Sequence, residues 1–224
     1  MLDLLIGGIK RIVLNKTQSF AGFIFTDGQL GYEDLKGIFQ APTSGALSGA
    51  DEDFDGVTEK GYNANDIITF LFHVEHKDHT GGDKFLHVHI GIASGATASG
   101  SNLVITAVVK HRYHNLLGSG QALRTPSPAA KTFTFTVTPA QLNEVKGDTL
   151  VVEQLVAQSG GSASLLDSDS WLSDDDIAVQ FTVTTLPTIT GGTSQRLRFP
   201  HSDFHRTNLY GGTPRRFFVN GSFW

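Results

Sequence analysis

The chain has 224 residues and a formal net charge of −5, and it contains no cysteine, which excludes disulfides, thiolate metal ligands and cysteine nucleophiles. Charged residues make up 17% of the chain, below the usual quarter, and its apolar runs are far too short to cross a membrane, so we expect no membrane partner. Frequent Gly, Ser and Thr favour a β-rich protein, and the length allows one large domain or one domain with extended arms.

Residues 1–50 are expected to form an N-terminal arm. They contain one candidate strand, at residues 20–25, and then a segment rich in Gly, Ser and Ala. Connections of this length and composition usually contact partners or lie outside a packed core. We therefore place the arm outside the folded body.

An acidic segment follows the arm. Asp51, Asp53 and Asp55 alternate in the sequence, and Gly56 comes next, as in the opening of a calcium loop. Position twelve of such a loop is Tyr62, where a bidentate glutamate is expected. The favoured interpretation is a solvated acidic loop, and a cation site is the alternative.

Residues 51–187 are expected to form the body of the protein, because they contain six runs in which apolar and polar side chains alternate. These runs are residues 67–76, 85–92, 103–113, 132–137, 150–156 and 177–184. Turn-rich spacers separate them, and helical periodicity is almost absent. The pattern predicts an all-β fold, an antiparallel jelly-roll-like β-sandwich with extended N- and C-terminal arms and at most one or two short helices.

One helix is expected near residues 140–146. Thr138 is a suitable N-cap, Pro139 suits the first helical position, and Gln141 completes a capping box. Gly147 stands where the helix would end.

Five of the nine histidines lie within residues 72–90, on both sides of the break at Thr80-Gly81-Gly82. Two alternating runs around such a break predict a β-hairpin. With the turn centred on Gly81, His73 faces His89 and Glu75 faces His87, on the side of the sheet away from the apolar residues. Three imidazoles and one carboxylate could bind a divalent transition metal such as Zn, Fe, Mn or Ni.

Two other interpretations of these histidines remain open. In one, they form hydrogen bonds with one another, with nearby carboxylates or with a neighbouring subunit, and no metal or other cofactor is needed. In the other, a threefold axis brings two histidines from each of three chains around one ion.

A catalytic alternative comes from the spacing Gly81-x5-His87-Val88-His89, which resembles the opening of the first cupin motif. It implies a cupin-like metal-dependent enzyme that uses His87 and His89. The glutamate that should follow is absent, since Ala93 and Ser94 occupy its place. Phosphate loops, serine elbows and kinase motifs are also absent, so we expect a protein that is not an enzyme.

Residues 188–224 are expected to form a C-terminal arm that binds a partner. This segment carries a net charge of +4, which leaves −9 for the rest of the chain. Its arginines are interleaved with aromatic residues instead of forming a dense cationic run, so we expect it to bind protein, either its own body or another chain, and not nucleic acid. The candidate contact residues are Arg196, Arg198, Phe199, Phe204, Arg206, Tyr210, Arg215, Arg216, Phe217, Phe218 and Trp224.

The order of several motifs resembles a group of virion structural proteins of tailed bacteriophages. The first is His73-Val74-Glu75-His76, followed by Asp78, Gly81-Gly82 and His87-Val88-His89. A late strand preceded by acidic residues, in residues 174–183, also matches. The resemblance covers roughly residues 65–200.

The resemblance implies a jelly-roll protein that acts as a non-enzymatic virion component. A head decoration, or cement, protein that stabilises the capsid lattice through its β-sandwich and arms is the first expectation, and a tail- or fibre-associated protein is the alternative. A homotrimer, contacts with the major capsid protein, and a place in virions assembled in the host cytoplasm are implied as well.

Overall fold

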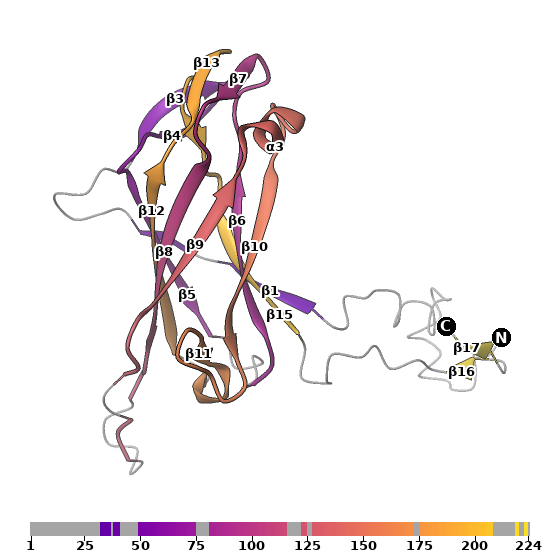
Figure 1. Ribbon diagram of the computed structural model, residues 1–224. Coiled ribbons are helices and arrows are strands. Elements are labelled where there is room, and N and C mark those ends of the chain that lie inside the picture. Colours follow the sequence, from indigo (N-terminus) through magenta and orange to yellow (C-terminus); the bar gives the residue numbers. More distant parts are fainter. Residues whose placement is uncertain are drawn as a thin grey trace. The chain divides into compact units, whose positions relative to one another are not determined.

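The computed structural model of the protein describes residues 32–36, 38–40, 49–74, 81–115, 122–124, 127–172, 175–207, 218–219 and 222–223 (Figure 1). The chain divides into two units. The larger unit is Leu35–His205, and the chain on either side of it forms the second. In the second unit, β16 (Phe218–Val219) pairs with β17 (Ser222–Phe223) in an antiparallel hairpin.

Two five-stranded sheets form the body of the larger unit. The first has the order β1 (Tyr32–Lys36), β15 (Ser202–Thr207), β6 (Lys84–Ile90), β10 (Leu150–Gln158) and β11 (Leu166–Asp167). The second has the order β2 (Ile38–Gln40), β5 (Ile67–His73), β12 (Asp176–Thr185), β8 (Leu103–Arg112) and β9 (Lys131–Val137). The six strands predicted from alternation are confirmed as β5, β6, β8, β9, β10 and β12.

The neighbours in these sheets follow one rule. Among the eight long or terminal strands β1, β5, β6, β8, β9, β10, β12 and β15, the first lies beside the last, the second beside the seventh, the third beside the sixth, and the fourth beside the fifth. A long hairpin rolled up on itself gives this order, which is the topology of a jelly roll. The predicted all-β, jelly-roll-like sandwich is therefore confirmed.

The core lies between the two sheets and is built by period-2 alternation. On β12, Ile177, Val179, Phe181 and Val183 are all fully buried, while the residues between them face outward. On β9, the phenylalanines and the valine are buried and the threonines are exposed. Since successive side chains of a strand point to opposite faces, each of these strands supplies one apolar face to the core.

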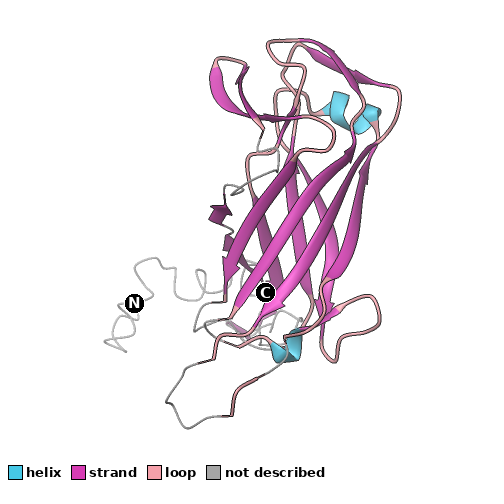
Figure 2. Ribbon diagram, turned by 90° about the vertical axis from the view of Figure 1, so that its left-hand side faces the viewer, coloured by secondary structure: helices cyan, strands magenta, loops and turns pink. Residues whose placement is uncertain are grey.

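Smaller elements close the two ends of the sandwich. One short sheet has the order β14 (Leu197–Arg198), β4 (Val57–Tyr62) and β3 (Ala50–Phe54), and another pairs β13 (Thr188–Gly191) with β7 (Ala96–Ser99). The helix α3 (Pro139–Glu144) lies at the same end as β7 and β13, and the 3-10 helix η2 (Ser168–Ser170) lies at the opposite end (Figure 2). The capping box between Thr138 and Gln141 is confirmed.

The sandwich extends beyond the body that the sequence predicted at residues 51–187. Strands β1 and β2 fall in the expected N-terminal arm, and β13, β14 and β15 fall in the expected C-terminal arm. The arm boundaries at 50 and 188 are therefore wrong. The reason is topological: in a jelly roll the first and last strands are neighbours, so both ends of the domain enter the same sheet. The candidate strand at residues 20–25 lies outside the described residues.

Candidate functional site

His87 and His89 lie on β6 and point away from the core. Burial alternates along this strand: Leu86, Val88 and Ile90 are fully buried, whereas the two histidines are partly exposed. The predicted placement of the pair on the face opposite the apolar one is thus confirmed. In a cupin, the corresponding ligands point into the barrel, so this geometry differs from the cupin arrangement.

His73 lies in the other sheet, so the predicted hairpin is wrong. The strand that carries it, β5, pairs with β12 and β2, whereas β6 pairs with β10 and lies beside β15. Gly81 and Gly82 therefore belong to a connection between two sheets, and such turn residues suit either kind of connection. His73 contacts Asp176 instead, at 3.3 Å, and Glu75 lies outside the described residues.

Asp203 joins the two histidines of β6. It lies on the neighbouring strand β15, and its side chain is only 8% exposed. Its Oδ2 atom is 2.8 Å from Nε2 of His89, and its Oδ1 atom is 3.0 Å from Nδ1 of His87. Oδ1 thus faces one imidazole, whereas Oδ2 also lies 3.6 Å from Nε2 of His201. The third histidine of this group, His201, stacks on His89 with ring centroids 3.7 Å apart.

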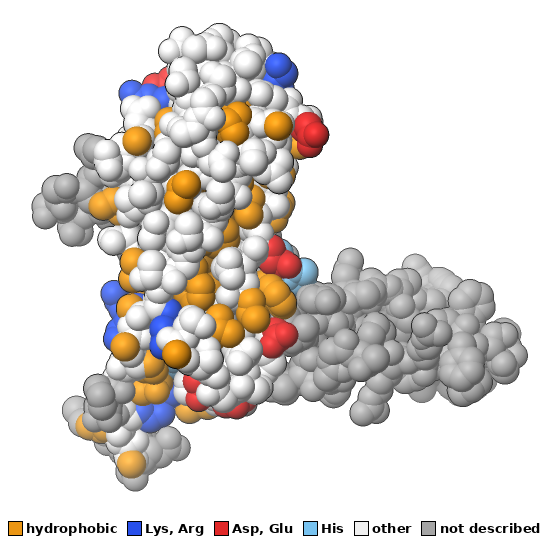
Figure 3. Space-filling model, in the orientation of Figure 1, with side chains coloured by type: hydrophobic (Ala, Val, Ile, Leu, Met, Phe, Trp, Pro, Cys, Tyr) orange, Lys and Arg blue, Asp and Glu red, His pale blue; other side chains and the backbone are white. Residues whose placement is uncertain are grey.

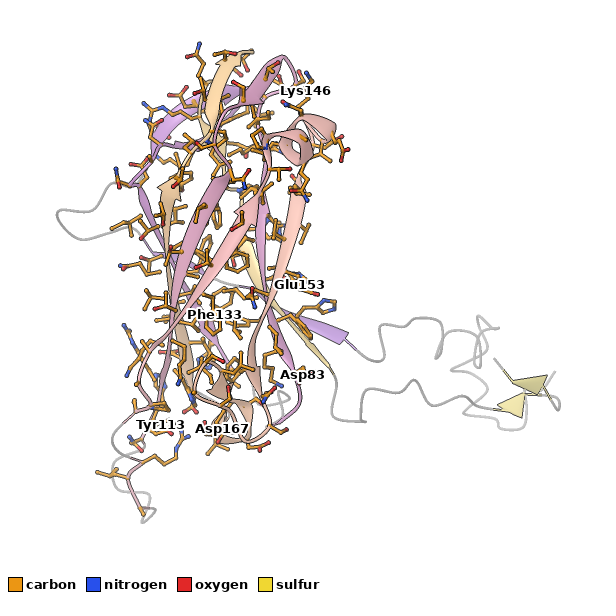
Figure 4. The ribbon with its side chains drawn as sticks, viewed as in Figure 1. Asp83, Tyr113, Phe133, Lys146, Glu153 and Asp167 are labelled. Carbon is orange, nitrogen blue, oxygen red and sulfur yellow. The ribbon has the colours of Figure 1, made fainter. Side chains whose placement is uncertain are left out.

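Glu153 approaches the same cluster from the other side. It lies on β10 directly opposite His87 in the strand register, and its side chain points outward (Figure 4). Its Oε2 atom is 2.9 Å from Nε2 of His87 and 4.0 Å from Nδ1 of His205. Figure 3 shows histidine and acidic side chains together at one margin of the sandwich. His87 therefore has a carboxylate at each ring nitrogen.

These contacts shift the ionisation of the cluster. The Asp203 carboxylate raises the pKa of His87 above its ordinary value; burial opposes this shift, and Glu153 adds to it. Burial alone would raise the pKa of Asp203, but the contacts with His87 and His89 outweigh it and hold that pKa well below the usual range. The cluster therefore favours an ionised Asp203 beside imidazoles.

Two overlapping groups of ligand atoms could hold a metal ion among the described residues. The first is His87, His89 and Asp203, and the second is His87, Glu153 and His205. Imidazole and carboxylate together suit divalent first-row transition metals. Sequence reasoning found His87 and His89 but missed Asp203, Glu153 and His205 as their partners.

A second histidine–carboxylate cluster is buried at the end of β8 and β12. Asp175 is fully buried, and its carboxylate receives hydrogen bonds from His111, from both terminal nitrogens of Arg124, and from the backbone N–H groups of Leu172 and His114. Such a satisfied buried carboxylate ties a loop to two strands. The sequence showed acidic residues before the late strand at this point, and the anchoring role of Asp175 was missed because its donors come from distant segments.

Ser170, His111 and Asp175 lie in the order of a Ser–His–Asp triad. The hydroxyl of Ser170 is 3.4 Å from Nδ1 of His111, but it donates its hydrogen to the carbonyl oxygen of Asp167 at 2.7 Å. Arg124 also holds Asp175. Burial, aided by the charge of Arg124, keeps the pKa of His111 below its ordinary value despite the hydrogen bond to Asp175. The arrangement is that of an anchoring cluster.

The acidic segment forms the hairpin of β3 and β4. Asp55 and Gly56 make its turn with φ values of 56° and 92°, which favour Asp and Gly. Asp51 pairs with Lys60 at 2.7 Å, Asp53 accepts a hydrogen bond from the N–H of Gly56, and Asp55 accepts two from Ser94. The three carboxylates thus bind separate partners and do not converge on one point.

Four of the expected partner-binding residues are used inside the protein. Arg196 pairs with Glu52 at 2.9 Å and Arg198 with Glu59 at 3.4 Å, while Phe199 and Phe204 belong to the core. The assignment of these four side chains to a partner contact is therefore corrected: they attach the last strands to the acidic body. The other candidates lie outside the described side chains: Arg206, Tyr210, Arg215, Arg216, Phe217, Phe218 and Trp224.

No protein-family model matches the chain, and no curated protein is similar enough in sequence to count as a relative. Within the described residues, no helix has the length and apolar character needed to span a bilayer. The interpretation of the site therefore depends on its own geometry.

Proposed function

We propose that this protein is a structural component of a tailed-bacteriophage virion, most simply a head decoration protein whose β-sandwich binds and stabilises the capsid lattice. Several described parts of the motifs that resemble such virion proteins lie on strands of a jelly roll: His73 on β5, His87-Val88-His89 on β6 and residues 176–183 on β12. The structure adds one surface feature that supports an assembly role, and this feature carries the proposal.

That feature is an uncharged outer face on the sheet of β5, β12, β8 and β9. We define the uncharged face by the outward residues of its central rows: Ile67, Thr69, Leu71, Val104, Thr106, Val108, Thr132, Thr134, Thr136, Ala178, Gln180 and Thr182. Adjacent strands hold these side chains in rows, such as Thr134 opposite Thr106 and Thr106 opposite Thr182. Over β8 and β9, Figure 3 shows mainly apolar and uncharged atoms, with charged groups toward the ends.

A face of this composition suits contact with another protein. The centres of protein interfaces are depleted in charged residues, because burying an unpaired charge is costly. The opposite sheet differs, since its outer face carries His87, His89 and Glu153. We therefore assign lattice binding to the uncharged face, and we expect a homotrimer, as in the proteins that the motifs resemble.

The test is binding to particles of the phage that encodes the protein. The full chain is added to capsids that lack it, and bound protein is measured by co-sedimentation, with a reconstruction of the decorated particle. Thr134→Lys places a charge at the centre of the uncharged face and should abolish binding. The matched control is Val151→Lys, on the exposed side of β10, which should bind like the wild type.

The outcomes separate the alternatives. Equal binding by both variants would move the contact away from the uncharged face. A wild-type protein that fails to bind capsids but co-purifies with tails or fibres would replace head decoration with the tail- or fibre-associated role. Light scattering on the isolated protein determines whether it forms the expected trimer.

A further inference from the structure

We propose that His87, His89 and Asp203 form a binding site for one divalent transition-metal ion, with Zn²⁺ as the ion that the site holds. The inference goes beyond the assembly role and does not depend on it. The ligands come from neighbouring strands, β6 and β15, on the outer face of the first sheet. Two residues of the metal site predicted from the sequence, His87 and His89, are ligands in this site as well. Asp203 on β15 takes the place of the predicted ligand Glu75. His73 lies in the other sheet and is not a ligand.

The spacing of the ligand atoms is the first observation in favour of the site. Zinc binds imidazole nitrogen and carboxylate oxygen at about 2.0–2.2 Å, so neighbouring ligand atoms around one tetrahedral ion are about 3.3–3.6 Å apart. In the structure, Nδ1 of His87 is 3.0 Å from Oδ1 of Asp203, and Nε2 of His89 is 2.8 Å from Oδ2 of the same carboxylate. The three ligand atoms all lie within 4.8 Å of one another. The two nitrogen–oxygen distances are thus shorter, by about half an ångström or less, than the smallest separation that a bound ion requires.

The state of Asp203 is the second observation. Its Oδ1 atom is buried and makes no hydrogen bond of acceptable geometry, although it lies 3.0 Å from the ring of His87. A buried carboxylate oxygen without an aligned donor is costly, and a cation is one of the partners that can satisfy it. A metal between this oxygen and the imidazoles would supply that partner.

Glu153 provides the outer contact that metal-binding histidines typically make. A ligating histidine usually donates its other ring N–H to a carboxylate, which fixes the tautomer and the orientation of the ring. Glu153 is 2.9 Å from Nε2 of His87, the nitrogen that does not face Asp203. In the zinc-bound state, a hydrogen on Nε2 would leave Nδ1 of His87 free to bind the ion beside Asp203.

Backbone contacts hold the ligands in place before any ion binds. The hydroxyl of Ser202 donates to the carbonyl oxygen of His87 at 2.6 Å, and the N–H of His89 donates to the carbonyl oxygen of His201 at 3.3 Å. These bonds fix the register between β6 and β15, and the side chains of His87 and His89 are each only 14% exposed. Sites held on rigid strands in this way keep their geometry.

The test is zinc titration of the full chain, produced without a polyhistidine tag and stripped with chelator. Calorimetry should give one Zn²⁺ per chain, and His89→Gln should weaken binding by more than about 100-fold, because it removes a direct ligand, whereas the loss of an outer partner costs about 10–100-fold. The matched control is His114→Gln, which removes a histidine that contacts an aspartate at 2.9 Å in the other sheet. This control should bind like the wild type, and zinc should raise the thermal midpoint of both proteins but not of His89→Gln.

Two further variants separate the inner ligands from the outer ones and protect the test against misfolding. Glu153→Gln changes a half-exposed side chain and should weaken binding by about 10–100-fold without abolishing it, and His205→Gln should leave the affinity nearly unchanged. The proposal is overturned if the wild type binds no zinc, if His114→Gln weakens binding as much as His89→Gln, or if His205→Gln abolishes binding while His89→Gln does not.

Discussion

Phe72 on β5 and Phe204 on β15 meet edge to face, with ring centroids 4.6 Å apart and an interplanar angle of 82°. Both side chains are fully buried, and they come from opposite sheets. Trp171 also contacts Phe204, with ring centroids 5.6 Å apart. The last strand of the jelly roll thus closes the core between the sheets instead of reaching outward as an arm.

Replacement of Phe204 by alanine should destabilise the protein strongly. The change removes a fully buried ring and leaves a cavity between the two sheets, which typically costs about 3–5 kcal/mol of unfolding free energy. Urea denaturation measures the loss. Val151→Ala changes a side chain that is 48% exposed and should shift the unfolding free energy by less than about 0.5 kcal/mol. Similar losses in the two variants would mean that Phe204 is not part of the core.

Two C-terminal truncations should behave differently. A chain that stops after Thr207 retains β14 and β15 and should fold, because the sandwich unit ends at His205. A chain that stops after Gln195 loses both strands together with Phe199 and Phe204, and should be unfolded or aggregated. Circular dichroism and size-exclusion chromatography distinguish the two results. A soluble β domain from the shorter chain would contradict this expectation and would support the C-terminal arm that the sequence predicted from residue 188 onward.

The interior strands could be predicted because they are buried on one face. In β9 and β12, apolar residues must recur at every second position to fill the core, and this alternation is visible in the sequence. Strand β15 has no such pattern, since Ser202 and Asp203 are buried beside Phe204 and His205 is partly exposed. Its place follows from pairing with strands far away in the chain, which local periodicity does not encode.

The candidate site was predictable only in part, for the same reason. Successive side chains of a strand alternate between its two faces, so the sequence alone placed His87 and His89 on the outer face, without any knowledge of the neighbouring strands. Asp203 is 114 residues from His89, so no motif spacing could link them. The predicted pairing of His73 with His89 was wrong because a connection between two sheets can use the same turn residues as a hairpin.

Asp175→Asn should cost far more stability than an equivalent change at the surface. The substitution removes the charge that binds His111 and Arg124 inside the protein, and loss of one member of a buried ionic cluster costs about 3 kcal/mol or more. Asp51→Asn is the control, since Asp51 pairs with Lys60 at an exposed position and should lose less than about 1 kcal/mol. Chemical denaturation of the two variants compares them directly, and equal costs would show that the cluster is not an anchor.

The stability of the fold should decrease in mild acid through His111. Burial holds the pKa of this histidine below its unfolded value of about 6.5, so below that pH the unfolded chain binds a proton that the folded chain does not. The contribution of neutral His111 to the unfolding free energy is therefore complete above about pH 6.5. It is lost as the pH falls toward the pKa of His111 in the folded protein. Asp175, whose pKa is also lowered, adds a further loss at more acidic pH.

The measurement that isolates His111 is the unfolding free energy of wild type and His111→Gln between about pH 7.5 and about pH 5. The contributions of the other histidines are common to both proteins, so the difference between the two pH profiles reports His111 alone. We expect the wild type to lose more stability than the variant as the pH falls, because glutamine binds no proton in the unfolded chain. Parallel profiles would mean that His111 is protonated as readily in the fold as in the unfolded chain, and the buried cluster would then have to accommodate an imidazolium beside Arg124.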